Sequence, residues 1–300
     1  MERLKTYLLS ARPGFFPAIV LPVLLGTSYA WKKEALFNPF FFTLTLSAAL
    51  LYHAGMNVIN DFFDYQNGTD NINKTPLSPF TGGSRMIQKG LMTPEGTLTF
   101  AILLILSGSA IGLYLSFLTG PLLLFFGAFG LFTGFFYSSP PLFLSGRSLG
   151  ELFAGINFGL LPVAGSYFVQ TGHLNFEVFF VSLPLSFLIA GLLYINEFPD
   201  LEADRSSNKK NLAVRLGAER GRFVFPLIEA LAYLSLITGV VLGYMPGFSL
   251  LALFPAYSAV RASGGIIRNY GKADTLLPSI KSAVFAHFAT GLILVLSLMI

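Results

Sequence analysis

Long apolar runs recur along the whole chain and are separated by short polar segments. Each run has roughly the length of a helix that crosses a bilayer core of about 30 Å, and such a helix satisfies its own backbone hydrogen bonds. The strict alternation of apolar and polar positions that is typical of a β-barrel strand is absent. The pattern therefore predicts nine membrane-spanning helices, at residues 14–31, 38–59, 97–118, 121–137, 149–170, 176–196, 223–244, 248–262 and 279–300.

The composition supports a membrane protein. Hydrophobic residues make up 54% of the 300 residues, whereas 19 Lys and Arg and 15 Asp and Glu carry the charge. Because no remaining segment is long enough to fold separately, we expect residues 1–300 to form one all-α, polytopic membrane domain. The chain has no cysteine, which excludes disulfides, iron–sulfur clusters and thiolate zinc sites.

The basic residues indicate an orientation. With the N-terminus inside, all Lys and Arg except Lys32 and Lys33 fall on the cytoplasmic side, as the positive-inside rule requires. We therefore expect an integral protein of a prokaryotic plasma membrane, with a cytoplasmic N-terminus, cytoplasmic active-site loops and an outer C-terminus. The net charge of +4 then resides in cytoplasmic loops, and no basic, aromatic-flanked stripe predicts nucleic-acid binding.

A cleaved signal peptide is the competing interpretation of the first thirty residues. Ser28-Tyr29-Ala30 follows an apolar run and imitates a small-residue cleavage site. The run is long for the hydrophobic region of a signal peptide, and Pro17 and Pro22 interrupt it. We therefore favour a retained span.

Two similar acidic segments end the second and sixth predicted spans, and this is a weak internal repeat. Such segments at equivalent helix ends are expected to face each other across a central cavity. Carboxylate and amide oxygens without cysteine suit a hard cation, above all Mg²⁺, which usually binds one or two carboxylates together with phosphate oxygens of a substrate. The predicted metal ligands are Asn60, Asp61, Asp64, Asp200 and Asp204.

The alternative is that these acids are ordinary helix-end residues paired with nearby basic side chains. For one acidic segment that interpretation would be preferred. Two matching segments favour a metal site, because ionisable groups at membrane depth are costly and usually functional. The implied substrate is a phosphorylated lipid.

Further candidates flank the two segments, and each has a second interpretation. The turn at 81–85 is rich in Gly and Ser and has backbone N–H groups suited to phosphate, but it is equally an ordinary turn. Lys209 is either a phosphate ligand or a positive-inside charge, and Asn57 either lines the cavity or joins two helices. Tyr137 either faces the cavity or anchors its helix at the interface. The three histidines are too scattered for a zinc site.

Together these segments resemble the UbiA superfamily of intramembrane prenyltransferases, over nearly the whole chain. The family is known for an Asn-Asp-x-x-Asp motif after its second helix and an Asp-x-x-x-Asp motif after its sixth, matched here by residues 60–64 and 200–204. The resemblance implies nine helices around a large cavity that opens laterally to lipid. It also implies two Mg²⁺ ions that hold a prenyl diphosphate.

Several stretches are most similar to the menaquinone branch, which prenylates 1,4-dihydroxy-2-naphthoate. They are Ala11-Arg12-Pro13, Thr81-Gly82-Gly83-Ser84, Gly150-Glu151-Leu152 and residues 212–217. Gly68 stands where the 4-hydroxybenzoate branch usually has another aspartate, which argues against ubiquinone synthesis. Asn211 is a departure, since the naphthoate branch usually has threonine there.

On this basis we expect ionisation of an allylic diphosphate followed by attack of an electron-rich aromatic carbon on the allylic cation. The predicted catalytic residues are Asp61, Asp64, Asp200, Asp204 and Tyr137, whose ring face would attract the cation. The predicted substrate-binding residues are Asn57 and, for the diphosphate, Arg85, Lys89, Arg147 and Lys209.

Two other functions stay open from the sequence. A transporter or lipid carrier is compatible with the weak repeat, although transporters usually place coupling-ion sites at the bilayer midplane. A prenyltransferase with another acceptor, a glycerol-phosphate lipid or 4-hydroxybenzoate, would share the chemistry. The expected partners are a polyprenyl diphosphate, a small aromatic acceptor and the bilayer, with no obligate protein partner.

Overall fold

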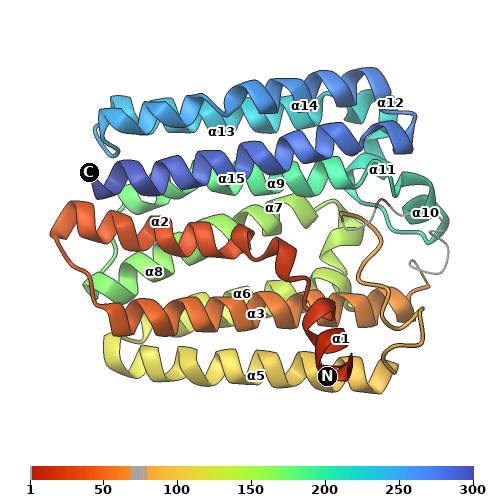
Figure 1. Ribbon diagram of the computed structural model, residues 1–300, viewed down its shortest axis with the longest axis horizontal. Helices are drawn as coiled ribbons and strands as arrows, with labels where there is room; N and C mark the ends of the chain where they lie inside the picture. The colour runs from red at the N-terminus through yellow and green to blue at the C-terminus, as the bar shows by residue number, and fades with distance from the viewer. Residues whose placement is uncertain (1, 69–76, 78–79) are drawn as a thin grey trace.

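The apolar runs of the sequence form long helices that lie side by side (Figure 1). The computed structural model describes residues 2–68, 77 and 80–300, and these residues contain no β-strand. The long helices are α2 (Pro17–Glu34), α3 (Pro39–Gln66), α5 (Pro94–Thr119), α6 (Leu122–Ser138), α9 (Glu177–Asn196), α13 (Val224–Val241), α14 (Ala256–Asn269) and α15 (Leu277–Met299).

The predicted count of nine spans is slightly off, because fewer helices meet the length and apolarity expected of a membrane-crossing helix. In the described part of the chain, seven helical segments are long and apolar enough to cross a membrane, and an eighth is a pair, Leu4–Phe15 and Pro17–Glu34, bent by 57°. The predicted span at 121–137 forms α6, an apolar helix of only 17 residues. It is short because Gly120 and Pro121 precede it and Pro140 and Pro141 follow it, and proline cannot continue a helix.

One span is interrupted in its middle. It consists of α7 (Gly150–Gly155), a π-helical turn (η3, Ile156–Leu160) and α8 (Leu161–Thr171). Pro162 lies at the start of α8, where its ring removes one backbone donor and favours such a break. The π turn carries Asn157, which lines the cavity described below.

Several short elements gather at one end of the bundle, opposite the C-terminus (Figure 1). They include α10 (Leu201–Ser206), α11 (Leu212–Leu216), α12 (Ala218–Gly221) and the 3₁₀ turn η2 (Leu144–Arg147). The remaining short elements are α1 (Glu2–Ser10), η1 (Pro13–Phe15), η4 (Gly247–Leu253) and η5 (Ala273–Thr275). The second acidic segment therefore lies in a folded cap on the bundle.

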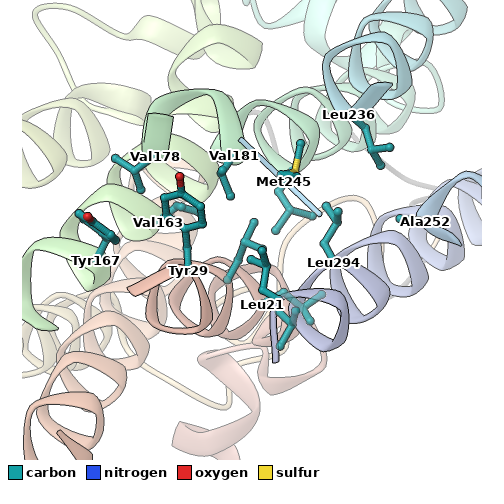
Figure 2. Close-up of a cluster of buried hydrophobic side chains, with 14 of the residues drawn as sticks. Leu21, Tyr29, Val163, Tyr167, Val178, Val181, Leu236, Met245, Ala252 and Leu294 are labelled. Atoms are coloured by element: carbon teal, nitrogen blue, oxygen red, sulfur yellow. The ribbon is translucent and has the colours of Figure 1, made fainter. Parts of the chain in front are cut away.

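The largest buried cluster is built around α2. Leu21 and Tyr29 of α2 pack against Val163 and Tyr167 of α8 and against residues of α9, α13 and α15 (Figure 2). The hydroxyl of Tyr29 donates a hydrogen bond to Glu177 at 2.5 Å. α2 therefore contributes to the largest buried cluster of the bundle.

We predict that Gly26→Ala destabilises the bundle. A Cβ atom at Gly26 would lie 2.1 Å from the backbone oxygen of Val163, so α2 and α8 would have to separate. The expected loss is about 1–3 kcal/mol of unfolding free energy. The measurement is unfolding in micelles, with Gly247→Ala as the matched control because nothing lies within 4 Å of its Cβ position. Equal stability of the two variants would contradict the packing described here.

Candidate active site

A cavity of about 690 Å³ lies inside the bundle and has one polar end. Side chains of α3, α5, α6, α8 and α9 supply most of its apolar wall. The polar end is lined by oxygen-bearing side chains from both predicted acidic segments and by two cations: Asn60, Asp64, Asn196, Glu197, Asp200, Asp204, Arg12 and Lys209. The structure thus brings together two segments that are far apart in the sequence.

The first segment lies at the C-terminal end of α3. Asn60 and Asp64 are one turn apart on the same face, and the Asn60 side-chain amide donates to Asp64 Oδ2 at 2.6 Å. The Ser138 hydroxyl, at the end of α6, donates to Asn60 Oδ1 at 3.2 Å. These bonds hold the Asp64 carboxylate at the cavity wall.

Asp61 has different partners. Its carboxylate pairs with Arg12 and accepts hydrogen bonds from the backbone N–H of Ser84 at 3.2 and 3.3 Å. It does not line the cavity in this conformation. Asp61 thus connects the N-terminal segment and the Gly-rich turn to α3, and its metal-binding role stays a prediction.

The second segment is centred on Asp204, which is only 2% exposed. Its carboxylate accepts a hydrogen bond from the Asn211 amide at 2.6 Å and lies 3.5 Å from the Lys209 ammonium. Burial raises the pKa of Asp204 to about 6, although the Lys209 charge opposes that shift. The Asn211 side chain also accepts from the Val214 N–H at 2.8 Å and so caps α11.

Lys209 is the cation beside Asp204 at the polar end. Burial alone would lower its pKa, but the carboxylates of Asp204, Asp64 and Glu197 raise the pKa above its ordinary value. The loop that carries Lys209 is held by its own N–H, which donates to the backbone oxygen of Asp204 at 2.9 Å. The ammonium is therefore charged and shared among carboxylates of both acidic segments.

Glu197 and Glu151 form a pair that the sequence-based site omitted. The two carboxyls are buried and close enough to interact electrostatically, and Glu197 accepts a hydrogen bond from the Ala213 N–H at 3.3 Å. Burial, reinforced by the charge of Glu151, raises the pKa of Glu197 well above its usual range. Glu197 lies in the Asn196–Asp200 segment, so the repeat could have identified it. The only indication of Glu151 in the sequence was its place in Gly150-Glu151-Leu152, one of the stretches similar to the menaquinone branch.

The other predicted substrate-binding residues divide into two groups. Asn57 and Tyr137 line the cavity, and the Asn57 amide also donates to the backbone oxygen of Ala11 at 3.1 Å. Lys89 and Arg147 are exposed and do not line the cavity, and Arg147 donates to the backbone oxygen of Pro141 at 3.0 Å. Arg85 lies outside the cavity lining in a left-handed backbone conformation, next to the cavity-lining residues Thr81, Gly82 and Gly83.

Two further cavity-lining polar residues were not predicted as site residues. His53 lies one turn from Asn57, between the rings of Phe16 and Phe158, and its Nδ1 has no partner among the described residues. Asn157, on the π turn, accepts a hydrogen bond from Thr133 at 3.0 Å. The helical register of His53 was visible in the sequence, whereas the π turn that orients Asn157 was not.

The donor set of the polar end fits Mg²⁺. No three His, Cys, Asp or Glu side chains within the described ranges lie close enough together to hold a metal by themselves. Magnesium does not require such a cluster, because it is usually held by one or two carboxylates, water and substrate phosphate. In addition, Oδ1 of Asn196 is buried at the cavity without a hydrogen-bond partner in the part of the chain described. Carboxylates from both segments and this amide oxygen would supply hard ligands.

The sequence of the chain identifies the class of protein. Residues 19–289 match the UbiA prenyltransferase family, so the chain belongs to that family and is an integral membrane prenyltransferase. It is 25% identical to the 1,4-dihydroxy-2-naphthoate octaprenyltransferase of Bacillus subtilis, over 96% of this chain and 90% of that protein. It is 28% identical to the enzyme of the same name from Mycobacterium tuberculosis, over 92% and 90% of the two chains.

Solved structures share the fold. A UbiA homologue from Archaeoglobus fulgidus, bound to DMAPP and Mg²⁺, superposes with a TM-score of 0.68 at 15% identity, over 97% of this chain and 99% of that chain. A digeranylgeranylglyceryl phosphate synthase superposes with a TM-score of 0.69 at 17% identity, over 100% and 99%. The predicted UbiA-type, all-helical fold is therefore confirmed.

We predict that Asn211→Ala loosens the cap around Asp204. The variant loses both the helix cap on α11 and the donor to a buried carboxylate, which should cost about 1–3 kcal/mol of unfolding free energy. Asn211→Thr keeps a capping oxygen and should lose clearly less. Denaturant or SDS titration of the protein in micelles measures both. An alanine variant as stable as the native protein would show that these two hydrogen bonds do not hold the cap.

Proposed function

We propose that this prenyltransferase transfers a polyprenyl group from an allylic diphosphate to 1,4-dihydroxy-2-naphthoate, in a reaction that depends on Mg²⁺. The observation that carries the proposal is a cavity that combines an acidic, amide-rich end with a long apolar wall. The names of the relatives from B. subtilis and M. tuberculosis support the naphthoate acceptor. The structure of the A. fulgidus homologue with DMAPP and Mg²⁺ supports the metal.

The polar end suits the departure of diphosphate. In the proposed reaction the bond between the allylic carbon and the diphosphate oxygen breaks, and both electrons leave with the diphosphate. Asn60, Asp64, Asp200 and Asp204 would hold two Mg²⁺ ions, with Asp61 as a further candidate. Bound Mg²⁺ supplies neutralisation of the charge that grows on the leaving diphosphate.

The chain itself supplies the remaining groups. The Lys209 ammonium lies beside Asp204 and is the predicted diphosphate-binding cation that lines the cavity. The ring of Tyr137 lines the cavity near the same end, where its face would attract the allylic cation. The ring carbon that bears the acceptor carboxylate then bonds to the allylic carbon, and the carboxylate leaves as CO₂, with the electrons of the broken C–C bond restoring the aromatic ring.

The basic residues support the proposed orientation. Lys32 and Lys33 end α2 at the end of the bundle away from α10 and α11, whereas Lys209, Arg205 and Arg215 lie in the folded cap. We propose that the cap and the N-terminus face the cytoplasm of a prokaryotic cell and that the C-terminus faces outward.

Single cysteines test this orientation, because the native chain contains none. Ser206→Cys in the cap should react with a membrane-impermeant maleimide only in inverted vesicles or lysed cells. His173→Cys, in the exposed loop after α8, is the matched variant and should react in intact cells. The reverse labelling pattern would contradict the proposed orientation.

Product analysis tests the reaction. Purified protein in liposomes is incubated with geranylgeranyl diphosphate, Mg²⁺ and either 1,4-dihydroxy-2-naphthoate or 4-hydroxybenzoate, with and without EDTA. We expect a decarboxylated prenyl-naphthoquinol, identified by mass spectrometry and abolished by EDTA. A prenylated hydroxybenzoate, or transfer only to a glycerol-phosphate lipid, would reject the naphthoate acceptor. No metal-dependent consumption of the diphosphate would reject the reaction and favour a lipid carrier.

Two asparagine variants, measured in the same assay, test whether Asp64 and Asp200 take part in the metal-dependent step. Asp64→Asn and Asp200→Asn keep the side-chain shape but remove a negative charge, so turnover should fall about 100-fold or more while the protein stays folded. Asp274→Asn, an exposed carboxylate near the start of α15, is the control and should keep native turnover. Near-native turnover in Asp64→Asn or Asp200→Asn would remove that residue from the proposed site.

A further inference from the structure

Two exposed arginines lie on α14, within a segment that is long and apolar enough to cross a membrane, Gly247–Asn269. Neither Arg261 nor Arg268 has an ion pair or a hydrogen bond with another side chain in the described part of the chain. Arg261 lies eight residues before the end of α14, which is about 12 Å along the helix. A charge in such a segment is costly and usually has a partner.

The Arg268 side chain lies back along α14 and does not extend past the end of the helix. A Cβ atom at Gly264 would lie 3.4 Å from Nη2 of Arg268 and 3.7 Å from its Cζ, so the guanidinium lies over Gly264. Gly264 is three residues after Arg261 and four before Arg268, and this spacing places all three on one face. The face therefore carries two cations, and α14 contains no acidic residue to neutralise them.

α15 borders this face of α14. Gly265 packs directly against Ser279 of α15, because a Cβ atom at Gly265 would overlap the Ser279 hydroxyl. Lys281, two residues further along α15, is a third exposed cation. From residue 256 to residue 300 the chain has four Lys or Arg and a single acidic residue, Asp274. The surface of the two helices thus has an excess of positive charge.

Exposed apolar side chains continue from the cations along both helices. They are Tyr257 and Val260 on α14 and Phe285 on α15. The two helices are antiparallel, because only residues 270–276 connect them. Tyr257 lies further from this connection than Arg261, and Phe285 lies further from it than Lys281. The cations are therefore nearer the connection and the apolar groups nearer the middle of the bundle, which matches the headgroup and acyl chains of a phospholipid.

This surface is separate from the proposed active site. Arg261, Arg268 and Lys281 do not line the cavity. On its other face, α14 turns Ala262 and Ile266 into a buried apolar cluster. The cations on the outer face therefore have no role in holding a diphosphate inside the bundle.

We propose that the outer face of α14 and α15 binds an anionic phospholipid, with its phosphate against Arg261 and Arg268. Its acyl chains lie along Tyr257, Val260 and Phe285. Charge complementarity selects this occupant, because guanidinium groups pair well with phosphate and basic surfaces between membrane helices bind anionic headgroups. The bound lipid neutralises two cations that have no protein partner among the described residues.

Lipid binding by the intact protein tests the proposal. Native mass spectrometry in a neutral detergent gives the dissociation constants of phosphatidylglycerol and phosphatidylcholine. The native protein should bind phosphatidylglycerol about ten-fold more tightly or better, and the double variant Arg261→Gln/Arg268→Gln should lose most of this preference. Arg205→Gln/Arg215→Gln removes the same charge from exposed positions of the cap and should keep the preference.

Two results of this experiment would overturn the site. A preference that persists in Arg261→Gln/Arg268→Gln would show that the lipid does not contact these arginines. An equal loss in both double variants would show a general attraction between the basic protein and anionic lipid. Neither result depends on turnover, so the proposed reaction is tested separately.

A glycine variant tests the position of the headgroup with all charges kept. Gly264→Leu fills the surface beside the Arg268 guanidinium and should weaken phosphatidylglycerol binding several-fold. Gly247→Leu is the matched control, because nothing lies within 4 Å of its Cβ position and it is far from the arginines in the chain. Native affinity in Gly264→Leu would overturn the assigned position.

Inorganic phosphate is the other source of the same charge. A large excess of it should leave phosphatidylglycerol bound, because the acyl chains contribute apolar contacts that the free ion lacks. Displacement of the lipid by inorganic phosphate would indicate a site for a free anion and would overturn the proposed phospholipid.

Discussion

The cost of burying negative charge in a hydrophobic bundle constrains the whole polar end of this protein. Asp64, Glu197 and Asp204 approach one another at the end of a cavity whose other walls are apolar. Like charges in such surroundings repel strongly unless a cation or a proton lies between them. Lys209 and Arg12 supply cations, and burial beside Glu151 raises the pKa of Glu197, which favours its protonated form. Metal ions and a diphosphate would change this balance without altering the scaffold.

The cap after α9 places Lys209 at the polar end of the cavity. Asn211 begins α11 and orients Asp204, and the backbone N–H of Lys209 closes the loop onto Asp204. The Ser148 hydroxyl donates to the backbone oxygen of Lys210 at 2.9 Å and connects the loop to the segment after α6. The same few residues therefore determine the fold of the cap and the electrostatics of the site. We expect substitutions there to affect stability and turnover together.

The apolar part of the cavity has the opposite requirement. This part of the cavity must stay open, although helices elsewhere in the bundle pack closely. At Gly26, for example, α2 closely approaches α8. Gly112 and Gly127 line the cavity with no atom within 4 Å of their Cβ positions, and Asn157 of the π turn also lines it. A charged end and an open apolar end together describe a site for an amphiphile with an anionic head.

The sequence predicted the fold well because apolar runs of span length have few alternative structures in a bilayer. The count of nine spans was slightly off by length and apolarity, because the prolines on both sides leave α6 with only 17 residues. The spacing of Asn60 and Asp64 and of Asp200 and Asp204 placed these residues correctly at helix ends.

The sequence alone could not predict contacts between segments that are far apart in the chain. The pairing of Asp61 with Arg12 joins residues 49 positions apart, and no local pattern indicates it. Lys209 lines the cavity, whereas Lys89 and Arg147 do not. This difference depends on how the cap after α9 folds back onto the bundle. Tyr137 had two equal interpretations because its position at a helix end gave its depth but not the direction of its side chain.

The most direct test of the account is a structure with Mn²⁺ and an unreactive thio-analogue of a long prenyl diphosphate. Manganese prefers the same oxygen ligands as magnesium and can be located by its anomalous scattering. The account predicts manganese between the acidic ends of α3 and α9, with the diphosphate against Lys209 and the chain along α6. Manganese bound elsewhere, or a diphosphate away from Lys209, would contradict it.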